Sequence, residues 1–371
     1  MSHPLAAFVR PGLTTATPYN ATHHDFAWQH RELDRLMSNE FPLPPSPAVM
    51  KAAMEAMAVG NLYPYSGEDL RTALADFAGV QPESVMLGNG STEIIDVVTR
   101  TLVGPGDEAI IATPTYAFFE TQTRLNGGSP VFVPLTETWD LDVPAIIASV
   151  TSKTKAIFLC SPNNPTGNGW TAAELRTVLA TSVPTVVDQA YIECGHAESF
   201  APLVAANPNL IVARTMSKGF GLPTLRVGYA IADPWLIDVL HRVRIPFSLS
   251  LVSIWAGLAA VREPEVLEQN RRYLTDERRR LFAALQAMPG VRAFPSEGNF
   301  ILVDISATGR LAPDVVAQTL EDRILIRAMT AHRLSGSHVR VTIGTTEQND
   351  RFARVFRRVL GLAPVGTTTR A

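Results

Sequence analysis

Short apolar runs alternate with amphipathic stretches along the first two thirds of the chain. The apolar runs are rich in Val, Ile and Leu, as in buried strands, and lie at 84–87, 108–112, 131–133, 155–160, 185–188, 210–213 and 227–232. Stretches with a helical spacing of apolar residues lie at 48–58, 68–78, 91–102, 114–125 and 172–180. Strands that are apolar on both faces and alternate with helices are typical of a mostly parallel sheet with helices on both sides. The pattern therefore predicts a large, doubly wound α/β domain.

The last third of the chain has a different pattern. We expect a long, charged helix at 263–288, strands at 291–294, 300–304, 324–327 and 339–343, and helices near 313–319 and 347–360. These elements predict a smaller α+β domain. The first 30 residues are rich in Thr, His and Pro and predict an irregular arm. We predict three parts, which are an N-terminal arm with part of the small domain (1–47), a large cofactor-binding domain (48–250) and a small domain (251–371).

The composition narrows the class of function. The chain has 371 residues and a formal net charge of −3, which gives no electrostatic reason to expect nucleic acid or an anionic membrane as a partner. Its apolar runs are shorter than the ~20 residues of a membrane-spanning helix. Cys160 and Cys194 do not form a disulfide framework, so we expect a cytoplasmic protein. His23 and His24 are poorly placed for joint metal binding; we interpret them as a polar surface segment and expect no metal site.

The stretch ARTMSKGFGLPTLRVG at 213–228 contains the candidate for covalent chemistry. A short apolar strand leads into a polar turn that carries Lys218 between Ser217 and Gly219. Burial disfavours the charged form of a lysine, so an amine inside the protein can be neutral and nucleophilic. This placement suggests a Schiff base with an aldehyde cofactor. Such a cofactor also needs an anion site, a ring partner and a counter-ion.

Candidates for the anion site follow the predicted strands, where ligands bind in open α/β sheets. Gly90, Ser91 and Thr92 open a predicted helix, and the first N–H groups of a helix can hold an anion. Ser217 and Arg226 flank the lysine turn and can complete a phosphate site.

A second set of residues can face a flat ring. Asp188 ends a buried strand, where an unpaired carboxylate is costly, so it requires a cation such as a protonated pyridine. Tyr191 follows three residues later and can reach a ring oxygen, and Asn164 lies in a turn between prolines and can donate to an oxygen. Tyr116 can stack on the ring, but a structural role fits its position equally well.

Nine motifs, in this order along the chain, carry a resemblance to a known family. They are SNEFP (38–42), YPYSG (63–67), GNGSTE (88–93), PTYAFFE (114–120), SPNNPTG (161–167), VVDQAYIE (186–193), TMSKGFGLPTLRVGYAIA (215–232), EGNFILV (297–303) and VRVTIGT (339–345). Together they resemble the fold-type I aminotransferases that depend on pyridoxal 5'-phosphate. Within that superfamily the chain is most similar to the histidinol-phosphate aminotransferases and their relatives.

The resemblance implies a role for each candidate residue. Lys218 binds the cofactor as a Schiff base and transfers the proton, and Asp188 keeps the pyridine nitrogen protonated, so that the ring withdraws electrons. Asn164 and Tyr191 bind the ring hydroxyl oxygen, and Tyr116 stacks on the ring. The cofactor phosphate is bound by Gly90, Ser91, Thr92, Thr215, Ser217 and Arg226.

The resemblance also implies a substrate site and a dimer. Arg340 matches the arginine that holds the anionic end of the substrate, and Arg327 matches a second arginine of the histidinol-phosphate group. One arginine suits a carboxylate and two suit a phosphate, although Arg327 can also be read as an ordinary strand arginine. Asn164 and Phe41 are further substrate candidates. Tyr63 resembles a tyrosine that reaches the phosphate of the neighbouring subunit, which implies a homodimer.

Three positions depart from the family pattern. Phe41 replaces an asparagine, Gln189 replaces an acidic residue, and the tyrosine expected in the arm has only Tyr19 as a candidate. An added phenyl ring fits an apolar substrate side chain as well as it fits histidinol phosphate.

Three hypotheses of function follow. The first is a transaminase that moves an amino group from histidinol phosphate, or from a free aromatic or specialised amino acid, to a 2-oxo acid, with 2-oxoglutarate as the expected acceptor. The second is another reaction of the same cofactor, such as decarboxylation of a phospho-amino acid or an oxygen-using oxidation. The third is a non-catalytic regulator, which the short, Pro-rich N-terminal segment disfavours.

Overall fold

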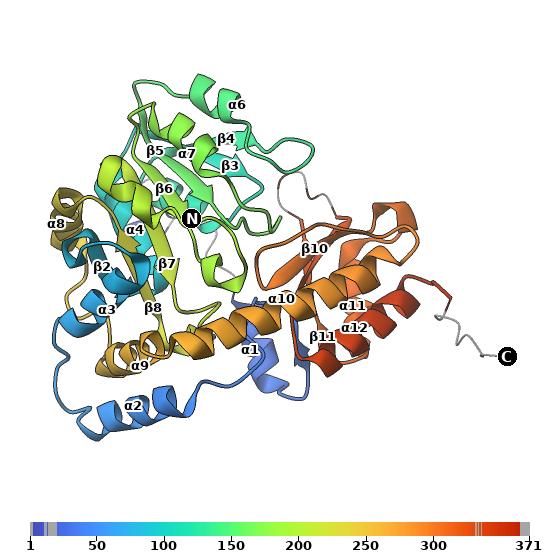
Figure 1. The fold of residues 1–371 in the computed structure, drawn as a ribbon. Helices are drawn as coiled ribbons and strands as arrows, with labels where there is room; N and C mark the ends of the chain where they lie inside the picture. Colours follow the sequence, from blue (N-terminus) through green and yellow to red (C-terminus); the bar gives the residue numbers. More distant parts are fainter. Residues whose placement is uncertain are drawn as a thin grey trace.

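The computed structural model describes residues 3–10, 13, 21–330, 332, 334 and 336–363, and its larger part is built on a seven-stranded sheet (Figure 1). In spatial order the strands are β2 (Val85–Asn89), β8 (Val227–Ile231), β7 (Leu210–Thr215), β6 (Thr185–Asp188), β5 (Thr154–Cys160), β3 (Glu108–Thr113) and β4 (Ser129–Pro134). β8 is antiparallel to both of its neighbours, whereas the strands from β7 to β4 are parallel. The mostly parallel α/β sheet predicted from the sequence is confirmed.

Helices cover both faces of this sheet, because successive side chains of a strand point to opposite faces. Ile110 and Ile157 lie in the core on one face, and the next residues, Ile111 and Phe158, lie in the core on the other. The first face is covered by α3 (Glu68–Ala78), α6 (Val143–Ala148), α7 (Ala172–Leu179) and α9 (Leu251–Val261), with α2 (Pro47–Ala58) packed on α9. The second face is covered by α4 (Gly90–Leu102), α5 (Phe118–Leu125) and α8 (Pro234–Val243).

The smaller part is built on an antiparallel sheet. Its strands, in spatial order, are β12 (Arg327–Met329), β13 (His338–Thr342), β10 (Phe300–Asp304) and β9 (Arg292–Ala293). The helices α10 (Pro264–Gln286), α11 (Ala312–Glu321) and α12 (Thr346–Val359) share a separate core with this sheet. In Figure 1, α10 runs from the large part to the small part.

The N-terminal segment is attached to the smaller part. A parallel pair between β1 (Asp34–Arg35) and β11 (Ile324–Leu325) follows α1 (Thr22–Gln29). Short 3-10 segments lie at Pro4–Phe8, Pro82–Ser84, Ile192–Cys194, Ala201–Ala206, Pro223–Leu225 and Ser306–Thr308. Because β1 pairs with β11, residues from the start of the chain lie beside residues from its last third.

The sequence pattern did not predict α1, α6, α8 or α9, and the expectation of an irregular arm over the first 30 residues is wrong where α1 forms. The sequence does contain a helix-start signal for α8, because Asp233 caps this helix and Pro234 is its first residue. α9 is almost entirely apolar, and its residues Leu258 and Ala260 belong to the core of the large sheet. The boundary between the core of the large sheet and the core of the small sheet therefore lies after α9, beyond residue 250. The three-part division into residues 1–47, 48–250 and 251–371 stays a proposal.

Candidate active site

Lys218 lies in the turn after β7, where backbone carbonyls of a distant segment hold its amine. Its Nζ donates hydrogen bonds to the carbonyl oxygens of Ser38 (3.2 Å) and Asn39 (3.1 Å). Burial, together with the guanidinium of Arg340, lowers the pKa of Lys218 to about 8. A lysine with this pKa is neutral in a useful fraction of molecules near neutral pH, as a nucleophilic amine must be.

Asp188 ends β6 inside the protein. Its Oδ1 accepts a hydrogen bond from the backbone N–H of Ala190 at 2.9 Å. Burial raises the pKa of this carboxyl to about 7, and the hydrogen bond from Ala190 and the charge of Lys218 oppose the shift only in part. A carboxyl with this pKa is only partly ionised near neutral pH, and a further cation beside it would favour the charged form, so the position suits a protonated ring nitrogen.

An anion site forms where α4 begins. Gly90 adopts a φ of +71°, and its N–H donates to the carbonyl of Arg226 at 2.7 Å. A Cβ at Gly90 would lie 2.4 Å from Nη2 of Arg226, and one at Gly228 would lie 2.2 Å from the backbone of Gly90, so this cradle requires glycine at both positions. The hydroxyls of Thr215 and Ser217 lie 2.8 Å apart, and Nη1 of Arg226 donates to Ser217 at 3.4 Å. Helix N–H groups, hydroxyls and a guanidinium together suit a phosphate.

Ser91 and Thr92 occupy the first turn of α4, where backbone N–H groups have no partner within the helix. Tyr116 is half-buried, and its ring centroid lies 5.9 Å from those of Phe118 and Phe119. The structure thus gives Tyr116 aromatic neighbours and places Ser91 and Thr92 beside the cradle.

Asn39 organises the site, although the sequence analysis assigned it no role. Its Nδ2 donates to the hydroxyl of Tyr191 at 2.9 Å, and its carbonyl accepts from both Lys218 and Asn299. Its backbone N–H donates to Oγ1 of Thr342 at 2.9 Å. The signal was present in the motif SNEFP, but Asn39 lies 179 residues from Lys218 in the chain, and no local pattern predicts their contact.

The two arginines of the substrate prediction are register partners on neighbouring strands. Arg327 of β12 pairs with Arg340 of β13. Arg340 donates from Nη1 to Oδ1 of Asn164 at 2.5 Å and from Nη2 to the carbonyl of Met37 at 2.9 Å. Arg327 places Nη1 3.2 Å from Nε2 of His23. Like charges directly opposite each other in a sheet repel, so this pair has a cost that an anion would remove.

The N-terminal arm carried two predictions, one about His23 and His24 and one about Tyr19. The interpretation of His23 and His24 as a polar surface segment is wrong for His23, because this half-buried side chain contacts Arg327. The missed contact joins positions 304 residues apart. Tyr19, the candidate for the arm tyrosine, lies outside the described residues.

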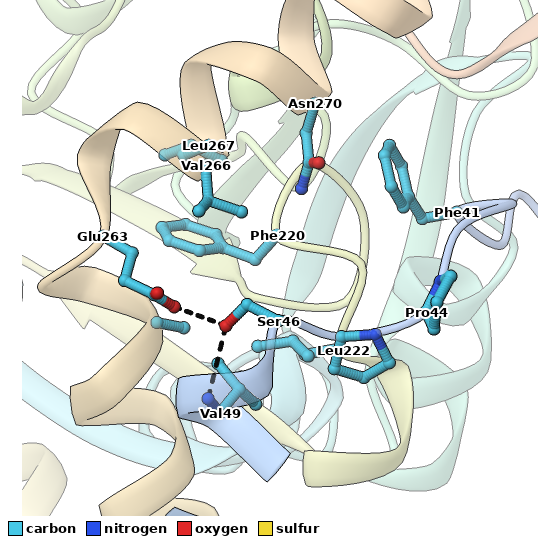
Figure 2. A pocket seen from close by; sticks show the side chains of 12 residues that line it. Phe41, Pro44, Ser46, Val49, Phe220, Leu222, Glu263, Val266, Leu267 and Asn270 are labelled. Carbon is cyan, nitrogen blue, oxygen red and sulfur yellow. Dashed lines mark hydrogen bonds between the residues drawn. The ribbon is translucent and has the colours of Figure 1, made fainter. Parts of the chain in front are cut away.

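Phe41 packs against Gly221, in the turn that follows Lys218. A Cβ at Gly221 would lie 2.9 Å from its ring, and its ring centroid lies 6.4 Å from that of Tyr273. Figure 2 shows that it lines a small pocket beside α10, together with Phe220 and Asn270. Neither Arg327 nor Arg340 lines this pocket. Phe41 therefore packs against the turn that carries Lys218, on the side of the small pocket.

A buried polar cluster lies beneath the same turn. Gln189, in the place of the expected acidic residue, accepts from Nη2 of Arg214 at 3.0 Å, and Arg214 also donates to Ser199 at 2.6 Å. Glu193 is buried under Gly219, and within the described part of the chain neither of its carboxylate oxygens has a hydrogen-bond partner. Burial raises the pKa of Glu193 to about 7, with Arg214 opposing the shift.

We predict that Glu193→Gln changes the pH dependence of stability. The carboxyl has a higher pKa in the folded protein than in the unfolded chain, so the folded state binds more protons between about pH 4.5 and 7. This residue therefore costs stability as the pH rises through that range, and the variant removes the cost. Relative to wild type, the variant is expected to gain ~1–3 kcal/mol in unfolding free energy between pH 5 and pH 8.

Urea unfolding of the cofactor-loaded protein at both pH values checks this prediction. Glu321→Gln at an exposed position of α11 is the control and is expected to show the wild-type difference. An equal pH dependence of all three proteins would contradict the raised pKa of Glu193.

The described residues form neither a metal-binding cluster nor a helix suited to cross a membrane. No group of three or more His, Cys, Asp or Glu side chains in the described ranges is arranged to hold a metal ion. Across the same part of the chain, no helix is both long and apolar enough to cross a membrane.

The fold and site define a class of enzyme. A nucleophilic lysine, a buried carboxyl that requires a cation and a glycine-lined anion cradle match the three reactive groups of pyridoxal phosphate: its aldehyde, its ring nitrogen and its phosphate. The residues present therefore fit this cofactor.

Comparison with known proteins gives the family. Residues 32–356 match the family model of aminotransferase class I and II, so the chain belongs to this family, and it is a transaminase that uses pyridoxal 5'-phosphate. It is 36% identical over 334 residues to the histidinol-phosphate aminotransferase of Methanothermobacter thermautotrophicus, with 88% of each chain covered. It is 35% identical over 377 residues to histidinol-phosphate aminotransferase 2 of Pseudomonas fluorescens, with 97% of this chain and 99% of the relative covered.

A solved structure agrees with this assignment. The histidinol-phosphate aminotransferase from Sinorhizobium meliloti in complex with pyridoxal-5'-phosphate matches with a TM-score of 0.86 and 25% identity, over 95% of this chain and 97% of that one.

Proposed function

We propose that this transaminase takes the amino group of histidinol phosphate and gives it to a 2-oxo acid, 2-oxoglutarate. The observation that carries the proposal is the register pair of Arg327 and Arg340, whose guanidinium groups lie on one face of the small sheet, and the charge of Arg340 acts on Lys218. A phosphate accepts hydrogen bonds from several such groups and neutralises their repulsion. The names of the two relatives, at 36% and 35% identity, support the same donor.

The chain's own residues have these proposed roles. When bound, the cofactor supplies an electron sink for the pair of electrons left when the donor loses its Cα proton. Nζ of Lys218 holds the cofactor aldehyde and, once released, moves that proton. Asp188 accepts a hydrogen bond from the ring N–H, Tyr116 stacks on the ring, and Asn164 and Tyr191 orient the ring oxygen. The phosphate is held by Gly90, Ser91, Thr92, Thr215, Ser217 and Arg226.

A half-reaction tests the donor. Loaded enzyme, without an acceptor, is mixed with histidinol phosphate and separately with a panel of free amino acids, and the cofactor absorbance is followed. We expect rapid conversion to pyridoxamine phosphate with histidinol phosphate. Conversion with one class of amino acids alone would overturn the proposed donor. Release of carbon dioxide or uptake of oxygen, without pyridoxamine phosphate, would indicate another reaction.

We predict that Arg340→Ala raises the KM for the donor. The change leaves the bound anion with only one of its two proposed charged partners, and breaking such a buried pair costs roughly 2–5 kcal/mol. Steady-state kinetics at saturating acceptor measures the effect, and Arg340→Lys, which keeps the charge, is expected to recover part of the loss. An unchanged KM would remove Arg340 from the substrate site.

Arg327→Ala is the matched variant that separates the two classes of donor. It is expected to raise the KM for histidinol phosphate strongly and to change the KM of a donor that lacks phosphate little. Equal effects on both donors would contradict the role of Arg327 as a phosphate ligand.

We also propose a homodimer in which Tyr63 completes the neighbouring site. Tyr63 is 86% exposed and lies against Phe247, with ring centroids 5.4 Å apart. Met54 and Met57 on α2 and Leu62 are also more than half exposed, and an apolar surface of this kind is typical of an interface. The buried, unpaired Cys160 and Cys194 support our proposal of a cytoplasmic location.

Mixing two impaired variants tests whether the two subunits share each active site. We predict that Tyr63→Ala and Lys218→Ala are each impaired, and that mixing them under conditions of subunit exchange restores activity. Each mixed dimer then has one site with Lys218 from one subunit and Tyr63 from the other. Light scattering is expected to give twice the monomer mass of 40.3 kDa. No recovery from a mixture that does exchange subunits would contradict the shared site.

A further inference from the structure

His23 accepts a hydrogen bond from an arginine of the proposed substrate site. Its Nε2 lies 3.2 Å from Nη1 of Arg327. A guanidinium group has only donors, so the imidazole nitrogen that faces it must carry a lone pair. His23 is therefore neutral in this arrangement, with its proton on Nδ1.

The charges around His23 keep it neutral. Arg327 on β12 and Arg340 on β13 face it from the small sheet, and on its own helix His24 and Asp25 are its charged or titratable neighbours. Only Asp25 among these four favours a protonated imidazole. Burial and the two arginines lower the pKa of His23 to about 4.

The environment of His24 adds further charges to the same region. The charges that act on it are those of Arg35 and Glu40 on the segment after α1, of Arg327, and of Lys218 in the turn after β7. The ring centroids of His23 and His24 lie 4.3 Å apart. The region around His23 and His24 thus has four cationic side chains from distant parts of the chain, and the imidazole of His23 accepts a hydrogen bond from one of them.

We propose that His23 is a specificity-determining residue for a dianionic group at the far end of the donor. A dianion that binds between Arg327 and Arg340 accepts the N–H that Arg327 gives to His23 in the free site. The freed Nε2 takes one proton from solvent, and the resulting imidazolium donates to the same anion. This inference rests on the proposed function, because it names how the site selects a phosphate over a carboxylate.

The proton uptake follows from simple electrostatics. Two negative charges within hydrogen-bonding distance add to the effect of the Asp25 carboxylate and offset the charges of Arg327 and Arg340, so the pKa of His23 rises when the anion binds. A monoanionic carboxylate neutralises one arginine and leaves the second to hold His23 in the neutral form. The charge state of the histidine therefore reports the charge of the bound group.

Calorimetry with sulfate tests the inference directly. Sulfate is a dianion that does not titrate near neutral pH, so any proton taken up on binding belongs to the protein. Loaded enzyme, whose cofactor fills the other anion site, is titrated with sulfate at pH 6.5 in buffers of different ionisation heat. We expect uptake approaching one proton per site for wild type.

Matched variants assign the proton to one residue. His23→Gln keeps a neutral polar group near Arg327 but cannot be protonated, and it is expected to bind sulfate about tenfold more weakly with almost no proton uptake. His24→Gln is expected to keep the wild-type uptake. Wild-type uptake in His23→Gln, or its loss only in His24→Gln, would overturn the inference. Equal cofactor absorbance and melting temperature show that each variant is folded.

Kinetics separates failure of this inference from failure of the proposed function. For histidinol phosphate, His23→Gln is expected to lose about tenfold in kcat/KM at pH 6.5, through KM, with a smaller loss at pH 8.5. For an amino acid without phosphate, the variant is expected to lose much less of its kcat/KM, with no difference between the two pH values. Wild type that does not use histidinol phosphate would overturn the proposed function. Wild type that uses it, with a variant of unchanged pH profile, would overturn only the role of His23.

Discussion

Replacing Lys218 with alanine is expected to abolish turnover, with a loss of at least about 10⁴-fold in kcat. In the role proposed for Lys218, the variant loses both the covalent attachment of the cofactor and the group that transfers the proton, and general acid–base catalysis alone contributes 10²–10⁴-fold. The placement of the amine supports this expectation, because Nζ is held by the carbonyls of Ser38 and Asn39 and its pKa is lowered to about 8.

Reduction of the loaded enzyme with borohydride, followed by peptide mass analysis, locates the attachment. The cofactor mass is expected on the peptide that contains Lys218 and is expected to be absent from the variant. Lys155→Ala, at an exposed position on β5, is the matched control and should retain both the label and full activity. A labelled Lys155, or an active Lys218→Ala, would remove Lys218 from the chemistry.

Replacing Asp188 with asparagine is expected to lower kcat by about 10²- to 10³-fold. The amide can still accept from the N–H of Ala190, so the local fold is preserved, but it has no charge to pair with a ring N–H. Breaking one half of a buried ion pair costs ~3–5 kcal/mol. The loss should fall on kcat more than on the KM for the donor, because Asp188 acts on the ring and not on the distal group of the substrate.

Steady-state kinetics with cofactor in excess measures this effect. Asp233→Asn is the control, because Asp233 also follows a strand of the large sheet but only caps α8 by accepting from the N–H of Trp235. It is expected to keep wild-type kcat. A wild-type kcat in Asp188→Asn, with the cofactor bound, would show that the ring nitrogen does not depend on this carboxyl.

The large sheet could be predicted because its signals are local. Each of its strands is an apolar run bounded by a turn, and the strands from β7 to β4 run parallel as such runs suggest. Helix α9 was missed because its sequence is apolar on nearly all sides, so it has no amphipathic period to detect. The predicted strand at 324–327 divides into β11 and β12, which pair in two different sheets, a result that no local pattern contains.

The cofactor prediction depended on residues that directly follow strands. Parallel strands bring their carboxyl ends to one edge, so a lysine after β7, an aspartate at the end of β6 and a glycine turn after β2 must lie near one another once the sheet forms. The sequence by itself thus determined the class of fold through its pattern of strands and helices, and it indicated the cofactor and the family through the resemblance of its motifs.

Tertiary structure decided how the substrate side of the site is built. His23 meets Arg327 across 304 residues, and Asn39 meets Lys218 across 179, because β1 pairs with β11 and brings the N-terminal segment to the small sheet. Phe41, which the sequence placed near the substrate, packs against Gly221 for the same reason. Contacts of this kind depend on the path of the whole chain, whereas a sequence pattern reports only the neighbours within one element and its turn.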